Sequence, residues 1–333
     1  MKSLRTLGAA ALALTASLAP AHAETLVFAS TNPAPVPINR FFEQWVEKVN
    51  ATANGAVEIQ LRHGPTLANQ VNAYDRVIDG VVDIAWSGSV FNPGKFTNSL
   101  AFSIPFFIQT SEQGAQAACA MHENGAFGAD YEDLHPLLFG FFGNSALHTV
   151  DRELTDGLAG MKDLTIIAPS SSAVEITLGN EATPISVNVT EAYESLQRGA
   201  ADGMIIPFSA FPAFQLGDVL NHHYAAPLGG MLGAVFMAKS DYEALSDEAR
   251  AALDAHSTCE DTREFGVFMD EWSNGAMEMA RGLEGHTFHE MSQDEIDGII
   301  AGVGGDIRES FEQAFPGGKP LIDEMIMQVE AFK

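Results

Sequence analysis

Three consecutive serines are the residues whose position in the sequence most resembles that of a nucleophile. Ser170, Ser171 and Ser172 stand where an apolar strand is expected to give way to a helix. Helix capping is the better interpretation, because a serine hydroxyl commonly accepts the free backbone N–H groups of a first helical turn. The backbone amides of the same serines would also make a small anion site.

The histidines do not predict a catalytic or metal centre. His222 and His223 are adjacent, so their side chains diverge if they lie in a strand, and we expect solvated or singly bonded imidazoles. His286 and His289 have the i,i+3 spacing of a surface metal site on a helix, but Gly285 disfavours a helix there. The sequence has no G-x-S-x-G, H-E-x-x-H or Walker A motif. We therefore predict no catalytic residues, no metal and no cofactor.

A repeated unit predicts the elements that surround these side chains. Residues 73–83 and 192–202 both follow the pattern A-Y-x5-G-x-x-D. In each copy a helix is expected to end at the glycine, Gly80 or Gly199, which suits the left-handed conformation of a helix C-cap. An aspartate then opens an apolar strand. Each copy also follows a strand, a helix and a strand, so each is a β-α-β-α-β unit with a parallel sheet.

Two such units predict an α/β fold with two Rossmann-like lobes, a hinge and an interlobe cleft. Ligands of open α/β sheets bind at the carboxyl ends of the strands, here residues 29–32, 86–89, 169–171 and 206–208. These ends come from both lobes, so one small molecule could hold the lobes closed. An exported two-lobed protein without catalytic motifs is typical of a solute-binding protein.

The N-terminus predicts export. Lys2 and Arg5 precede an apolar run, residues 7–18, that is too short to span a bilayer, and Ala21-His22-Ala23 is an A-x-A cleavage site. Cleavage after Ala23 would leave Glu24 first. No later segment is an uninterrupted apolar stretch of spanning length. We expect a protein that is not membrane-embedded and that resides in the periplasm of a Gram-negative cell.

Composition and charge exclude other classes of partner. The formal net charge is -27, with 17 basic and 44 acidic residues, which repels phosphate backbones and argues against nucleic acid. We divide the chain into a signal peptide (1–23), a first α/β lobe with a crossing strand (24–150), a second α/β lobe (151–230), and a return strand with bracing C-terminal helices (231–333).

The chain has two cysteines, Cys119 and Cys259, and no C-x-x-C motif. An even number of cysteines in an oxidising compartment permits one disulfide. The sequence alone does not show that the two thiols meet, so a disulfide and two buried thiols both stay open.

Several segments resemble the solute-binding subunit of TRAP transporters, the tripartite ATP-independent periplasmic transporters. Residues 182–203 resemble that family's G-A-x-P-V-x-M-x-x-S-E-V-Y-x-A-L-x-x-G-x-V-D-G signature, and 163–169 (D-L-T-I-I-A-P) resemble its G-L-K-I-R-V-P strand. Residues 64–67 resemble the turn before its first-lobe helix, and 103–106 its L-P-F segment. The resemblance implies a fold like that of type II periplasmic binding proteins, and delivery of a solute to TRAP membrane permease subunits.

The departures from the family pattern bear on the ligand. Ile167 stands where the resemblance implies an arginine that pairs with a substrate carboxylate, and Ile206 stands where it implies an asparagine. A second frequent arginine would fall within 146–148, where there is none, and Val189 replaces a phenylalanine. The usual acid-binding residues are therefore not carried over, and a carboxylate would lose a strong hydrogen-bonded pair.

Two readings of the ligand follow, and we favour the first. In the first, the solute is neutral, zwitterionic or cationic and fits an apolar and aromatic cleft, where Trp86 offers a π face. In the second, an organic acid binds through His148, Asn144, Gln70 or the amides near 170–172. Two other classes remain: a binding protein of an ATP-driven importer, which the 190–203 block disfavours, and a periplasmic enzyme, for which no nucleophile is coupled to a base.

The predicted ligand-binding residues are those closest to the strand ends. Trp86 and Phe208 are singled out because they occupy equivalent ends of the two repeat strands. The full set is Gln70, Tyr74, Trp86, Phe91, Asn144, His148, Ile167, Ser170, Met204, Ile206, Phe208 and Phe211.

Overall fold

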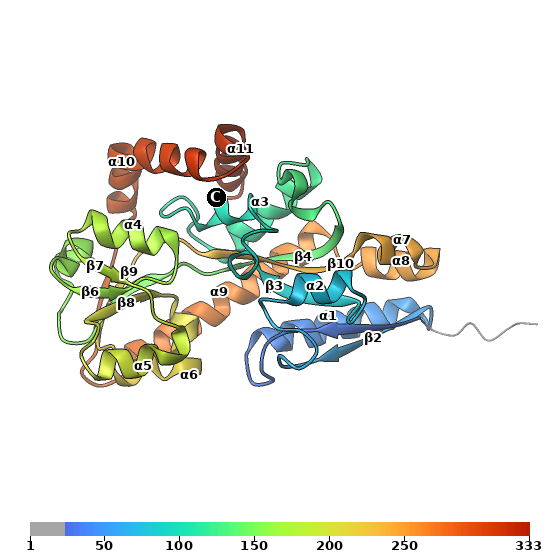
Figure 1. The fold of residues 1–333 in the computed structure, drawn as a ribbon, viewed down its shortest axis with the longest axis horizontal. Coiled ribbons are helices and arrows are strands. Elements are labelled where there is room, and N and C mark those ends of the chain that lie inside the picture. Colours follow the sequence, from blue (N-terminus) through green and yellow to red (C-terminus); the bar gives the residue numbers. More distant parts are fainter. Residues whose placement is uncertain (1–23) are drawn as a thin grey trace, which may run out of the picture.

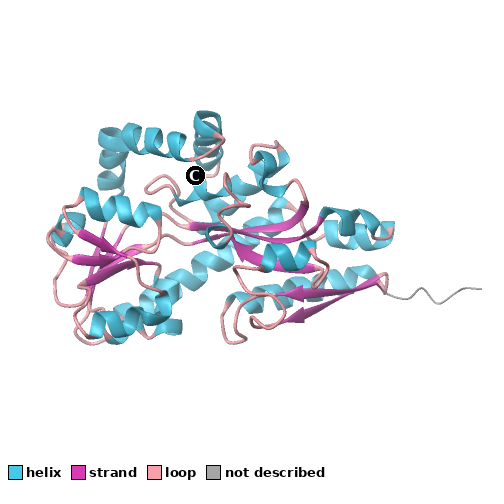
Figure 2. Ribbon diagram, viewed as in Figure 1, coloured by secondary structure: helices cyan, strands magenta, loops and turns pink. Residues whose placement is uncertain are grey.

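The structure is a computed structural model that describes residues 24–333. The predicted signal peptide, residues 1–23, lies outside the described residues. Two separate sheets, each covered by helices, form two lobes side by side (Figures 1 and 2). The predicted α/β class with two lobes is confirmed.

The first lobe is built on a five-stranded sheet with the order β2-β1-β3-β10-β4. Strands β1, β2 and β3 run parallel, while β10 is antiparallel to both of its neighbours. The bounds are β1 (Glu24–Ala29), β2 (Val57–Arg62), β3 (Ile84–Gly88), β4 (Leu134–Phe142) and β10 (Met231–Ala238).

The second lobe is built on a six-stranded sheet with the order β11-β9-β5-β8-β6-β7. Strands β7, β6 and β8 are parallel, and β5 is antiparallel to β8 and β9. The bounds are β5 (Ala146–Thr149), β6 (Thr165–Ile167), β7 (Thr183–Ile185), β8 (Gly203–Ile206), β9 (His222–Ala225) and β11 (Thr287–Glu290).

Helices cover both sheets and also join the lobes. Those of the first part of the chain are α1 (Ile38–Ala53), α2 (Ala73–Ile78), α3 (Ser111–Glu123), α4 (Ser171–Gly179), α5 (Val189–Gln197) and α6 (Phe211–Phe214). They are followed by α7 (Lys239–Ala244), α8 (Asp247–Asp254), α9 (Cys259–Arg281), α10 (Gln293–Ala314) and α11 (Gly318–Ala331). None of the helices in the described part of the chain is long and apolar enough to cross a membrane.

The sequence repeat is a structural repeat. The strand order β2-β1-β3 of the first lobe returns as β7-β6-β8 in the second. The two repeat glycines have the left-handed conformation predicted for them, with φ of 65° at Gly80 and 69° at Gly199.

The repeat aspartates explain why the pattern ends on that residue type. The Oδ2 atom of Asp83 accepts the backbone N–H of Val27 at 2.6 Å, and that of Asp202 accepts the N–H of Thr165 at 2.7 Å. In each lobe the carboxylate therefore fixes the start of one central strand, β3 or β8, against its parallel neighbour, β1 or β6.

The chain passes between the lobes four times. Residues 143–145 lead from β4 to β5, and 226–230 lead back from β9 to β10. Helix α9 then packs on α3 and β4 of the first lobe and on residues 208–210 of the second. Helix α10 returns along the other side to α11, which packs on α3 (Figure 1). We expected the lobe boundary at residue 150, which lies after β5. Because β5 pairs within the second sheet, the chain has already entered the second lobe before that residue.

The two strand crossings are bonded to each other. The N–H of Ser145 donates to the carbonyl of Gly229 at 2.9 Å, and the N–H of Leu228 donates to that of Ser145 at 3.2 Å. Gly229 has φ of 94°, and a Cβ there would lie 2.3 Å from the carbonyl oxygen of Ser103. Only glycine fits this position, so the first-lobe loop can approach the crossing closely.

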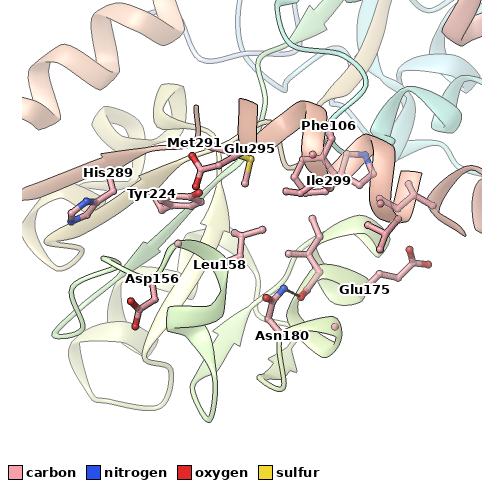
Figure 3. Close-up of a pocket in the computed structure, with 18 of the residues that line it drawn as sticks. Phe106, Asp156, Leu158, Glu175, Asn180, Tyr224, His289, Met291, Glu295 and Ile299 are labelled. Carbon is pink, nitrogen blue, oxygen red and sulfur yellow. Dashed lines mark hydrogen bonds between the residues drawn. The ribbon is translucent and has the colours of Figure 1, made fainter. Parts of the chain in front are cut away.

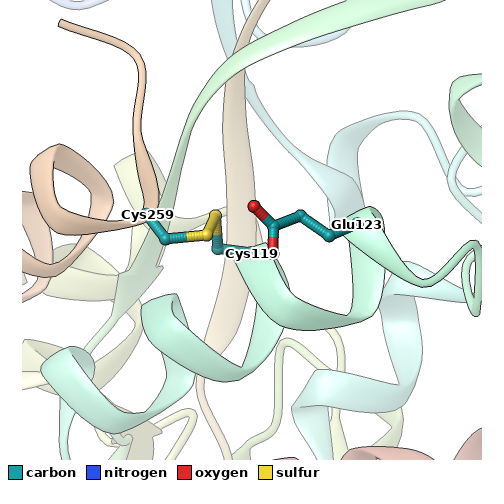
Figure 4. A group of neighbouring side chains, drawn as sticks. All are labelled: Cys119, Glu123 and Cys259. Atoms are coloured by element: carbon teal, nitrogen blue, oxygen red, sulfur yellow. A yellow bond between two sulfur atoms is a disulfide. The ribbon is translucent and has the colours of Figure 1, made fainter.

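Cys119 and Cys259 form a disulfide, which settles the pairing that the sequence left open. It joins α3 to the first residue of α9 (Figure 4). Glu123 lies beside the two sulfur atoms, but the disulfide leaves no thiolate there to bind a metal ion.

Candidate ligand-binding cleft

A cleft lies between the lobes at the carboxyl ends of β3, β6 and β8. Its volume is about 550 Å³, which is in the range of small-molecule sites. The walls come from residues 90–103 of the first lobe, from both strand crossings, from residues 169–175 and Pro207 of the second lobe, and from the end of α10. Such a position lets one small molecule contact both lobes.

The lining of the cleft is aromatic and hydroxylic. The phenylalanines are Phe91, Phe142, Phe311 and Phe315, and the serines are Ser103, Ser145, Ser170, Ser171, Ser172 and Ser310. Glu175 is the one charged residue among the described residues of the lining, which include neither lysine nor arginine. The cleft therefore has no basic side chain that could pair with a carboxylate.

The N-terminus of α4 opens onto the cleft. The hydroxyl of Ser170 accepts the N–H of Ala173 at 3.2 Å, so the predicted capping role is confirmed. The helix places a partial positive charge here, about half an elementary charge for a full helix. The neighbouring Ser172 hydroxyl donates to the carbonyl of Ser103 at 2.7 Å, which joins the lobes at the cleft edge.

The structure places two of the predicted residues, Phe91 and Ser170, on the cleft wall. Asn144 lies within the first crossing, between two lining residues. Its Nδ2 donates to the carbonyls of Ile108 at 2.8 Å and Gln109 at 3.1 Å, while its buried Oδ1 has no hydrogen-bond partner among the described residues.

Gln70 braces the first-lobe strand ends instead of facing the cleft. Its Nε2 donates to the Thr31 hydroxyl at 2.6 Å, and its Oε1 accepts the N–H of Gly88 at 2.9 Å. Both ends of the amide are therefore used to hold β1 and β3 together.

The remaining predicted residues are side chains of the two cores. Trp86 is fully buried on β3, with its ring centroid 5.4 Å from that of Phe265 and 5.6 Å from that of Phe42. Seven other predicted residues are also buried, in a core cluster or in direct contact with one. They are Tyr74, His148, Ile167, Met204, Ile206, Phe208 and Phe211. Because helices cover both faces of each sheet, the side chains at the strand ends point into a core. Trp86 and Phe208 therefore do not meet across the cleft.

The expectation for the adjacent histidines was right for His222 and wrong for His223. His222 makes one bond, with the Thr287 hydroxyl at 2.8 Å. His223 is fully buried and bonds two other histidines, His148 and His286. Burial lowers the pKa of His148 to about 3 and that of His223 to about 2, so both imidazoles are neutral.

His286 and His289, whose i,i+3 spacing we judged a weak signal for a metal site, bond different partners. His286 turns inward to His223, whereas the Nε2 of His289 lies 3.2 Å from a carboxylate oxygen of Glu153. In the part of the chain that the structure describes, the one group with ligand atoms close enough to hold a metal ion is the disulfide pair with Glu123.

Sequence reasoning missed Glu175 and the C-terminal phenylalanines. Glu175 stands four residues after Ser171 on the same helix, so the spacing alone could have placed it on the serine face. Phe311 lies in α10 and Phe315 directly follows it, and no sequence signal links that helix to strand ends more than a hundred residues earlier.

A larger hollow of about 1040 Å³ lies under α10 on the second lobe (Figure 3). Its apolar side chains include Phe106, Leu158 and Ile299, and Asp156 and Glu295 stand at its rim. It shares Ser172 and Glu175 with the cleft but contains no strand ends of the first lobe. We therefore assign the solute site to the cleft.

Comparisons with known proteins agree with this architecture. Residues 28–313 match the family "Bacterial extracellular solute-binding protein, family 7" (DctP). A solute-binding protein of Chromohalobacter salexigens is 22% identical over 67% of this chain, a match that spans 66% of that relative, just under two thirds. The C4-dicarboxylate-binding periplasmic protein DctP of Rhodobacter capsulatus is 23% identical over 86% of this chain and 87% of its own length.

A similar solved structure supports the fold. It is a TRAP solute-binding protein from a marine metagenome, specific for aromatic acid ligands and crystallised with 3-hydroxybenzoate. The two are 24% identical, with a TM-score of 0.82 over 93% of this chain and 99% of that one. With the family match over most of its length and two lobes around a cleft, this chain belongs to family 7 of the bacterial extracellular solute-binding proteins, the DctP family.

Proposed function

We propose that this protein captures a small solute with an apolar, aromatic-sized body in the interlobe cleft and delivers it to a TRAP-type membrane permease. The lining of phenylalanine rings and serine hydroxyls around one carboxylate, Glu175, carries the proposal. Closure of the lobes would bury the ligand, exclude water and strengthen the polar contacts inside.

The charges around the cleft favour a neutral, zwitterionic or cationic solute. Glu175 can bind an ammonium group. Ile167 stands where the family resemblance implies an arginine, and its side chain is buried in the second-lobe core. A zwitterion would use both polar features of α4: its ammonium group would lie near Glu175 and its carboxylate near the helix N-terminus.

An organic acid is the second candidate. The backbone amides of Ser171 and Ser172 begin α4 at the cleft wall, and such amides bind anions without a basic side chain. The similar marine protein binds an aromatic acid, which makes this class worth a direct test.

Four aromatic compounds that differ in charge separate the two candidates. Calorimetric titration would use L-phenylalanine as the zwitterion, phenethylamine as the cation, benzyl alcohol as the neutral compound and 3-hydroxybenzoate as the acid. We expect the zwitterion or the cation to bind at least tenfold more tightly than the acid. Tighter binding of 3-hydroxybenzoate would select the second candidate, and no binding of any compound would contradict the aromatic-sized solute.

Glu175→Gln tests the carboxylate within the same series. Removing one exposed charge should weaken cation or zwitterion binding by up to about fivefold, since exposed ion pairs contribute roughly 0.2–1 kcal/mol. The affinity for benzyl alcohol should not change. Glu191→Gln, in the first turn of α5 and outside the cleft, is the matched control.

We propose that the precursor is exported and cleaved after Ala23. Glu24, which would then come first, begins β1 and pairs with Val57, so this cut leaves the first strand whole. Intact mass spectrometry of the exported protein should give a chain that starts at Glu24. A mass that retains Met1 would contradict the cleavage.

A further inference from the structure

A chain of three imidazoles crosses the second sheet. The Nδ1 atoms of His148 and His223 are 2.8 Å apart, and the Nε2 of His223 is 2.9 Å from the Nδ1 of His286. His148 is on β5, His223 is its cross-strand partner on β9, and His286 immediately precedes β11. The chain therefore runs across three neighbouring strands, from the lobe interior to the half-buried His286.

The inner end of the chain holds the cleft edge. The Nε2 of His148 lies 3.0 Å from the carbonyl oxygen of Ile206, and the next residue, Pro207, lines the cleft. A carbonyl can only accept, so His148 must carry its proton on Nε2. Its Nδ1 is then an acceptor, His223 must donate from Nδ1, and His286 must in turn donate from its own Nδ1.

One end of this chain can take up a proton and the other cannot. The Nε2 of His286 carries no proton while its Nδ1 donates, so this atom can accept one. Burial lowers the pKa of His286, nearby His222 lowers it further, and the Gly217 carbonyl partly offsets both. A second proton, on His223 or His148, would place two N–H donors facing each other in one contact, with no acceptor between them. Because the Ile206 carbonyl cannot accept a proton, the chain does not conduct protons into the cleft.

The surroundings offer the inner pair no counter-ion. The rings of Phe208, Phe211 and Phe288 pack against His223, with centroids at 5.6, 5.5 and 4.5 Å. The charged or titratable side chains nearby are His222 on β9 and Arg281 of α9, which stacks on Phe288 and pairs with Glu278 and Glu290. No carboxylate among the described residues contributes to the pKa shifts of the three histidines.

We propose that His148, His223 and His286 are positioning residues: a chain with one fixed tautomer order that holds the Ile206–Pro207 edge of the cleft in place and accepts a single proton at its His286 end. It goes beyond solute capture and does not depend on the identity of the solute.

Nuclear magnetic resonance of the whole mature protein, labelled with ¹⁵N-histidine and with ¹³C on the Ile206 carbonyl, tests the order directly. At pH 7.5 and 5.5 we expect His148 protonated on Nε2, and His223 on Nδ1, with no change between the two values. As the pH falls, His286 should be the first of the three to gain a proton, on Nε2, without altering the others. A His148 tautomer protonated on Nδ1, or titration of His223 above pH 5.5, would overturn the proposal.

Variants at the exposed end test the coupling along the chain. His286→Asn keeps an N–H donor near the Nδ1 position but cannot titrate, so it should keep both inner tautomers and lose the pH response. His286→Leu removes the donor, so His223 should lose its single tautomer and the Ile206 carbonyl signal should shift. Unchanged inner signals in His286→Leu would show that the chain is not coupled.

His222→Gln is the control on the same strand, because its imidazole bonds Thr287 and none of the three histidines. It should leave the tautomers and the Ile206 signal as in the wild type. If His286→Leu does not fold, the wild-type tautomers and the His286→Asn response still decide the proposal.

Discussion

At the residue scale, two aromatic side chains of the first lobe should behave in opposite ways. Phe91 is 41% exposed and lines the cleft, whereas Trp86 is fully buried. Phe91→Ala should weaken binding of the compound selected above by about tenfold or more, as expected when about 1.5 kcal/mol or more of ring burial is lost, with little change in stability.

Trp86→Ala should lower the free energy of unfolding by about 3–5 kcal/mol. Calorimetry and urea unfolding measure the two effects, and a Trp86→Ala protein of wild-type stability would contradict the core assignment.

The buried histidines predict a loss of stability in acid. The pKa of His223 is about 2 in the folded protein, because burial disfavours the charged imidazole, and the ordinary value is 6.5. Its neutral form therefore contributes full stability above pH 6.5, and this contribution is lost as the pH falls from 6.5 towards 2. At pH 5.0 the loss should be about 2 kcal/mol for each such histidine.

Urea unfolding at pH 7.5 and 5.0 measures this loss. His223→Gln should lower overall stability but show a smaller difference between the two pH values than the wild type. His222→Gln should keep the wild-type difference. Equal differences in all three proteins would show that His223 is not held neutral.

At the scale of elements, the disulfide ties the long helix α9 to the first lobe. The Cys119–Cys259 bond closes a loop of 140 residues between α3 and the first residue of α9. Cys119→Ser with Cys259→Ser should lower the free energy of unfolding by about 2–4 kcal/mol, the usual range for a native disulfide. Thermal unfolding should give the same change when a reductant is added to the wild type. A reductant that leaves the melting temperature unchanged would contradict a stabilising role.

Helix α10 contains glycines that sterics do not require. A Cβ at Gly298 or Gly302 would have no heavy atom within 4 Å, whereas one at Gly304 would lie 3.4 Å from Ile300 and 3.5 Å from Phe107. Gly298→Ala and Gly302→Ala should each raise stability by up to about 1 kcal/mol, because alanine favours a helix over glycine. Gly304→Ala, in a tighter place, should gain less. Chemical denaturation of the three variants checks this order, and a loss at Gly302 would refute it.

At the scale of the whole molecule, four passages of the chain join two lobes that have separate cores. The two strand crossings are short and bonded to each other, while the lobes face a cleft that is open to solvent. A ligand that contacts both walls should shift the molecule towards a closed form, since closure adds contacts only when it is bound. Small-angle X-ray scattering should show a smaller radius of gyration with the best ligand, and a smaller decrease for Phe91→Ala at a ligand concentration near the wild-type dissociation constant. An unchanged radius in the wild type would contradict closure.

The two α/β lobes could be predicted from the sequence, because the A-Y-x5-G-x-x-D repeat encodes contacts that are local or within one lobe. The glycine C-caps and the Ser170 cap depend on a few consecutive residues, so local patterns were enough to predict them. The sequence likewise shows that isoleucine, and not arginine, stands at position 167. These features point to a solute-binding protein with an unusual cleft.

Which side chains reach the cleft could not be predicted from the sequence, because it depends on packing between distant segments. Trp86 and Phe208 end equivalent strands, but the helices that cover both sheet faces take up their side chains, and α10 supplies Phe311 to the cleft instead. The disulfide and the partners of His223 likewise depend on residues far apart in sequence. A side chain's direction from a strand is fixed by local geometry, whereas what it meets there depends on packing between distant segments.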